Sequence, residues 1–126
     1  LAHTAGDILI YIPKEKVLFT GDILETDYHP YLGDPESDID RWIKVLDRIM
    51  ELDVQMIIPG HGPISGKKEV VELKEYLEIF DVNAKRLATR YDDFCQILAE
   101  LKKILPKRSE MGVVISANIS DKYLKE

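Results

Sequence analysis

The sequence contains one cysteine, Cys95, so no disulfide can form within the chain. Because disulfides persist in oxidising compartments, this composition favours a reducing one, and we expect the protein to be cytoplasmic. Cys95 lies in an apolar helical pattern beside Phe94 and Leu98. That position predicts a small buried side chain rather than a nucleophile or a metal ligand.

The chain also lacks an excess of positive charge and any long apolar run. Its 17 Lys and Arg residues are outnumbered by 23 Asp and Glu residues, which gives a net charge of -6. Proteins that bind the phosphate backbone normally carry a basic patch, so we expect no nucleic-acid partner. No run approaches the ~20 apolar residues that a membrane-spanning helix needs, so we expect no membrane partner either.

Short apolar runs fill the first third of the chain. Residues 8–12 and 17–20 are β-prone and are separated by a short polar link at residues 14–16. This arrangement predicts an antiparallel hairpin, and the continuous apolar character of its strands predicts that both faces are covered. A third predicted strand, residues 54–58, leads directly into a proline- and glycine-rich segment.

Helical spacing dominates the rest of the sequence. Asp34 and Pro35 fit an N-cap and a first helical residue, ahead of one apolar face formed by Ile39, Trp42, Ile43, Leu46, Ile49 and Met50. A heptad-like apolar track from Leu73 to Leu105 fits one bent helix or two consecutive helices, the second capped near Asp93. Residues 111–126 fit both a strand and a helix, and the longer helical track favours a helix.

Three short motifs, each next to an apolar run, carry the chemistry. They are His3-Thr4-Ala5-Gly6-Asp7, Thr20-Gly21-Asp22 and Pro59-Gly60-His61-Gly62-Pro63. Imidazole and carboxylate groups are ligands for divalent metals such as zinc, and the glycines let backbone come close to such a site. A lone histidine after a strand is usually a surface residue, but the three motifs in this order are far more specific. Asp7 is interpreted as a turn residue rather than a ligand.

This order of motifs resembles the carboxy-terminal half of the metallo-β-lactamase-fold hydrolases, closely over residues 2–64 and loosely beyond them. The resemblance implies an α/β (α+β) fold, the second half of an αββα sandwich with short, mostly antiparallel strands and long C-terminal helices. Residues 1–64 would form the second half of the sheet with its metal-ligand loops, and residues 65–126 a helical segment.

The same resemblance implies the roles of three residues. His3 would bind the first metal, Asp22 would bridge both metals, and His61 would bind the second. The metals would be zinc, with iron or manganese as alternatives. In the intact parent enzyme a metal-bridging hydroxide would attack a small-molecule ester, thioester, lactone, amide or phosphodiester. The sequence does not indicate which of these bonds is cleaved.

One hallmark of that family is absent from these residues. The motif His-x-His-x-Asp-His, which supplies four further ligands, would lie upstream of Leu1 in a missing N-terminal half. Each metal would then keep one histidine and a shared carboxylate. We therefore expect the isolated chain to bind metal weakly and to be inactive. The uncovered face of its sheet favours a homodimer or association with the missing half.

Two further features have competing interpretations. His29 follows Asp22 by a few residues, so it is a candidate for substrate contact, and the alternative is a structured turn. The track over residues 73–105 permits a different function, a non-enzymatic interaction or dimerisation module. On the other interpretation these helices cover the sheet and one another.

Overall fold

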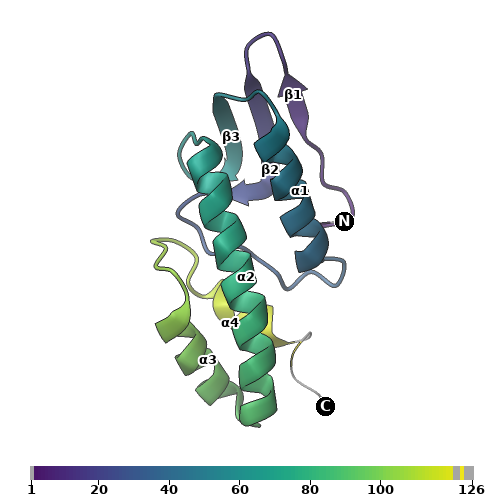
Figure 1. Ribbon diagram of the computed structural model, residues 1–126. Helices are drawn as coiled ribbons and strands as arrows, with labels where there is room; N and C mark the ends of the chain where they lie inside the picture. Colours follow the sequence, from purple (N-terminus) through teal and green to yellow (C-terminus); the bar gives the residue numbers. More distant parts are fainter. Residues whose placement is uncertain (1, 121–122, 124–126) are drawn as a thin grey trace.

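The computed structural model describes residues 2–120 and residue 123, and the described part of the chain has an α/β fold as predicted (Figure 1). Its sheet has three strands in the order β1 (Ile10–Ile12), β2 (Val17–Glu25) and β3 (Met56–His61). The predicted hairpin is confirmed, because β1 and β2 pair antiparallel. Strand β3 runs parallel to β2. Parallel neighbours need a crossover connection, and the helix α1 (Ile39–Glu51) lies in it.

Three further helices follow the sheet, namely α2 (Lys67–Arg90), α3 (Phe94–Ile104) and α4 (Val114–Ser120). The long apolar track therefore forms two consecutive helices rather than one bent helix. The Asp93 side chain caps the second of them by accepting a hydrogen bond from the Cys95 amide. Helix α4 confirms the helical interpretation over residues 114–120. Residues 121, 122 and 124–126 of that predicted segment lie outside the described residues.

The core lies between the sheet and helices α1 and α2, which pack side by side in Figure 1. Trp42 of α1 is fully buried, and its indole N–H donates to the carbonyl of Ile23 in β2 at 2.8 Å. On α2, Leu73, Leu77 and Phe80 are completely buried. The heptad-like track is therefore used for packing within this chain.

Two local predictions are wrong. The N-cap of α1 is Asp38, whose carboxylate accepts from the Arg41 amide at 3.0 Å, and not Asp34. Asp34 instead begins a turn, in which its carboxylate accepts from the Glu36 amide at 2.8 Å. Cys95 is exposed rather than buried, because the buried face of α3 is formed by Ile97 and Leu101.

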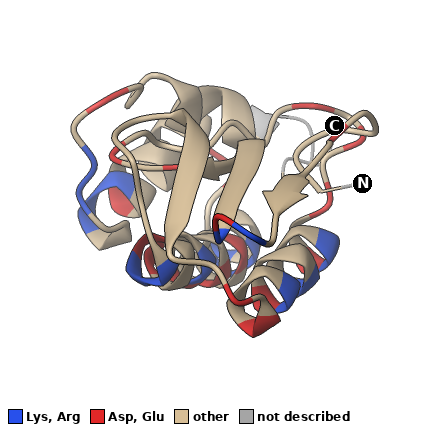
Figure 2. Cartoon of the chain, turned by 90° about the horizontal axis from the view of Figure 1, so that it is seen from above, with Lys and Arg blue, Asp and Glu red and all other residues tan. Residues whose placement is uncertain are grey.

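One face of the sheet is apolar and exposed in the described chain. Ile10, Phe19 and Met56 are 57%, 41% and 42% exposed, whereas Leu18 and its neighbour Ile57, between the strands and the helices, are fully buried. Charged residues gather on the helices and are sparse on the strands (Figure 2). None of the described helices has the length and apolar character needed to cross a membrane.

Candidate metal centre

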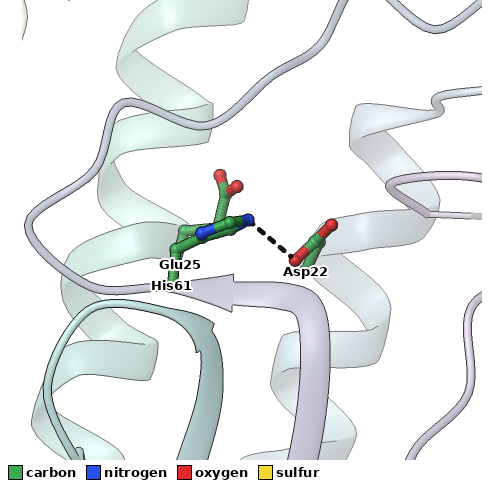
Figure 3. A group of neighbouring side chains, drawn as sticks. All are labelled: Asp22, Glu25 and His61. Carbon is green, nitrogen blue, oxygen red and sulfur yellow. Dashed lines mark ion pairs between the residues drawn. The ribbon is translucent and has the colours of Figure 1, made fainter. Parts of the chain in front are cut away.

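Asp22 and His61 come together at one edge of the sheet. Each follows an apolar stretch of its own strand, β2 or β3, and these strands are parallel neighbours. The Nε2 atom of His61 lies 3.4 Å from Oδ1 of Asp22 (Figure 3). Their side chains are 51% and 42% exposed, so both ligand atoms belong to a site that solvent can reach.

Two glycines allow this approach. The pairing of β2 with β3 shifts register on both sides of Gly21, which has a φ of 51°, in the left-handed region that favours glycine. Gly60 lies directly against Asp22. A Cβ atom at this position would collide with the Asp22 carboxylate and lie 2.6 Å from the carbonyl carbon of Gly21. The glycines of the second and third motifs therefore bring the two strands close enough for the side chains to meet.

Glu25 is a third member of this cluster. It is the register partner of His61 across the two strands, and one ligand atom each from Asp22, Glu25 and His61 lie within 4.8 Å of one another. Unlike the other two it is buried, with 6% of its surface exposed, and its Oε2 atom has no hydrogen-bond partner among the residues that the structure describes. Burial raises the pKa of the Glu25 carboxyl to about 8, and the neighbouring Asp22 charge adds to the effect.

Glu25 lies outside the three motifs that the sequence offers as metal ligands. In a regular strand, residues three apart point to opposite faces, so the spacing from Asp22 gives no reason to group them. The register shift between Gly21 and Glu25 removes that alternation. The available signal was that Glu25 directly follows the apolar residues Ile23 and Leu24. A glutamate in such a position is expected to have a partner, because glutamate is rarely buried without one.

His3 does not belong to this three-residue cluster. Its ring packs edge-on against Trp42, with 5.3 Å between ring centroids, and its Nδ1 atom lies 3.9 Å from Oδ1 of Asp7. Asp7 accepts hydrogen bonds from the amide and the hydroxyl of Thr4, as a turn residue does. The role of His3 as a ligand therefore stays a prediction.

His29 is buried and is not a member of the three-residue cluster. Its Nδ1 atom lies 2.8 Å from the Tyr76 hydroxyl, and its amide donates to the carbonyl of Glu110 at 3.0 Å. Burial, and then the Arg108 charge, lower its pKa. It lines a cavity of about 340 Å³ together with Lys102 and Arg108. These contacts fit the structured-turn interpretation, and contact with substrate stays a prediction.

The residues of the cluster suit a divalent metal ion. One imidazole and two carboxylates are borderline to hard donors of the kind that bind zinc, manganese or iron. The unpartnered Oε2 atom of Glu25 is a buried acceptor that lacks a donor in the described part of the chain. A cation would satisfy it. The donor set therefore fits a metal, and it does not select one.

Comparison with known proteins agrees with this geometry. Residues 1–61 match the model of the metallo-beta-lactamase superfamily. A curated relative, "Metallo-beta-lactamase type 2" of Bacteroides fragilis, is 26% identical over 76 residues, which are 58% of this chain and 30% of that protein. "Beta-lactamase-like protein 2 homolog" of Caenorhabditis elegans is 32% identical over 79 residues, covering 60% of this chain and 24% of that protein. The chain thus spans less than a third of the length of these relatives.

The helical part of the chain also has a structural counterpart. A solved structure of a double mutant of the sec-alkyl sulfatase PisA1 superposes with a TM-score of 0.70 at 19% identity, over 98% of this chain and 23% of that one. At this identity the likeness concerns the fold alone. The arrangement of sheet and helices seen here therefore occurs as part of a larger protein.

Proposed function

We propose that the chain is part of a metal-dependent hydrolase, because its residues 1–61 match the model of the metallo-beta-lactamase superfamily. The observation that carries the proposal is the meeting of Asp22 and His61 at 3.4 Å on adjacent strand ends. His3 would be the third ligand among the predicted residues. The metal would be zinc, in a two-metal centre for which the rest of the protein supplies the missing ligands.

The residues of this chain have defined tasks on this proposal. Asp22 and His61 would hold and orient the metal, and Gly60 keeps space for the Asp22 carboxylate. A bound divalent metal lowers the pKa of a coordinated water and polarises the bond to be cleaved. The side chains of Asp22 and His61 are 42% and 51% exposed, which leaves room for a substrate beside the site. The substrate would be a small-molecule ester, thioester, lactone, amide or phosphodiester.

The two parts of the chain would have different roles. Residues 1–64 would carry the metal-ligand loops, and residues 65–126 would support the sheet from one side. The chain alone would be inactive, because a histidine and a shared carboxylate leave each zinc short of the three protein ligands that catalytic zinc sites use. No observation favours the interaction-module alternative, since Leu73, Leu77 and Phe80 of its track are buried within the chain.

Metal titration of the chain tests the proposal. We expect Co²⁺ to bind the unmodified chain in one saturable transition, and Asp22→Asn and His61→Ala each to weaken this binding by at least about tenfold, through loss of a ligand. Asp92→Asn, which changes an exposed aspartate outside the site in the same way, is the control. Equal affinity in all four proteins, or no binding to any of them, would contradict the proposal.

A further inference from the structure

We propose that Glu25 is a metal ligand, so that this chain by itself presents Asp22, Glu25 and His61 to one divalent cation. The inference rests on the proposed function, because it concerns the same metal. It adds a ligand that none of the three sequence motifs contains. The alternative is that Glu25 is a buried structural residue with no part in metal binding.

Glu25 lies close enough to Asp22 and His61 to share a metal ion with them. Glu25 and His61 are register partners in the parallel pairing of β2 with β3, so their backbones are held side by side. Figure 3 shows the Glu25 carboxylate next to the His61 ring, with Asp22 across from it. A ligand atom of each residue lies within 4.8 Å of the other two, close enough for one cation to contact all three.

Burial is the second argument. Glu25 is 6% exposed, and its Oε2 atom makes no hydrogen bond to any described residue, although the Tyr31 backbone bonds to the carboxyl group. An unpartnered buried acceptor destabilises the fold, and more strongly when it is charged. A cation bound at the cluster would supply the partner that Oε2 lacks among the described residues.

Arg108 is a protein cation near Glu25, and its charge partly offsets the effect of burial on the pKa of the Glu25 carboxyl. The Nη1 atom of Arg108 donates to the backbone carbonyls of Glu25 and Tyr28, at 2.8 Å and 2.9 Å, and its guanidinium lies over the Tyr76 ring. Among the described residues no ion pair joins Arg108 to the Glu25 carboxylate. Arg108 therefore holds the backbone at the end of β2 through hydrogen bonds to carbonyl groups and not through the Glu25 carboxylate.

The ligand set has a chemical consequence. Two carboxylates and one imidazole give more oxygen than nitrogen donors. Oxygen donors suit harder ions such as Mn²⁺, and imidazole suits Zn²⁺ and Fe²⁺. The site would then take a divalent transition-metal ion through one buried and two exposed side chains. Glu25 would be the buried ligand of this metal site.

The test compares Co²⁺ binding and thermal unfolding for the chain, Glu25→Gln and Glu75→Gln. Glu75 is exposed and lines the same cavity of about 290 Å³ as Glu25, so its substitution is a matched change of charge. We expect Glu25→Gln to weaken Co²⁺ binding by at least about tenfold. Glu75→Gln should bind like the unmodified chain. Without metal, Glu25→Gln should unfold at the same or a higher temperature, because glutamine has nearly the same size and cannot ionise in this buried position.

The outcomes separate this inference from the proposed function. If Glu25→Gln binds Co²⁺ as tightly as the unmodified chain while Asp22→Asn does not, Glu25 is no ligand and the proposed function stands. If Glu25→Gln fails to fold or unfolds earlier without metal, its role is structural and the inference is overturned. If neither Asp22→Asn nor His61→Ala affects binding, the proposed function fails and the inference fails with it.

Discussion

At the scale of single residues, His29 gives the fold a testable pH dependence. Burial lowers the pKa of His29 below its ordinary value of 6.5. The folded chain therefore holds this imidazole neutral where the unfolded chain already binds a proton. The stability that depends on neutral His29 is complete above about pH 6.5 and is lost progressively as the pH falls below it.

We expect the free energy of unfolding in urea to drop more between pH 7 and pH 5 for the unmodified chain than for His29→Gln. The comparison between the two proteins is needed because Glu25 acts in the opposite direction. Its raised pKa of about 8 makes the chain less stable as the pH rises from 4.5 toward 8. Equal slopes for the two proteins would show that folding does not lower the pKa of His29.

Residue-scale features differed in how far the sequence could reveal them. The glycine motifs placed Asp22 and His61 at the ends of apolar runs, and the structure brings their side chains to 3.4 Å. This was foreseeable because both are local motifs at strand ends. Glu25 joins them only through the register shift at Gly21 and its pairing with His61, which no local pattern encodes.

At the scale of elements, the start of α1 depends on Asp38. Its carboxylate accepts the Arg41 amide, one of the donors that the first turn of a helix leaves without a partner. We expect Asp38→Ala to lower the free energy of unfolding by about 0.5–2 kcal/mol. Asp34→Ala, at the position predicted from sequence, is the control and should cost less. Urea denaturation measures both, and a larger loss for Asp34→Ala would contradict this assignment of the cap.

The sequence predicts most of the helices and strands, but not where each one begins or which strands pair in parallel. The hairpin and the helices follow from apolar spacing, which is local. Choosing between Asp34 and Asp38 as the cap was not possible from spacing, because both precede the same apolar face. The structure resolves it, since residues 34–37 close a turn in which the Ser37 amide donates to the Asp34 carbonyl. The parallel pairing of β3 depends on α1 packing back on the sheet, a tertiary event.

At the scale of the whole molecule, the described residues cover the sheet on one side only. Leu18 and Ile57 are fully buried on the side of the helices, whereas Ile10 and Phe19, which are register partners, are exposed on the other. The continuous apolar character of the strands predicted two covered faces, and this chain supplies one cover. A sequence pattern can show that a face needs a partner, but it cannot show where the partner comes from.

That open face gives the last prediction. Because exposed apolar patches favour association, we expect the chain to self-associate with increasing concentration in analytical ultracentrifugation. Phe19→Thr removes a ring that is 41% exposed and keeps a β-forming residue in the strand. Burying such a ring contributes about 1.5–3 kcal/mol, so the variant should associate at least about tenfold more weakly. Val82→Thr changes a 63% exposed residue on α2 and should associate like the unmodified chain.

If Phe19→Thr associates as strongly as Val82→Thr, the contact between copies does not use this face. If the unmodified chain stays monomeric, the open face by itself does not drive association.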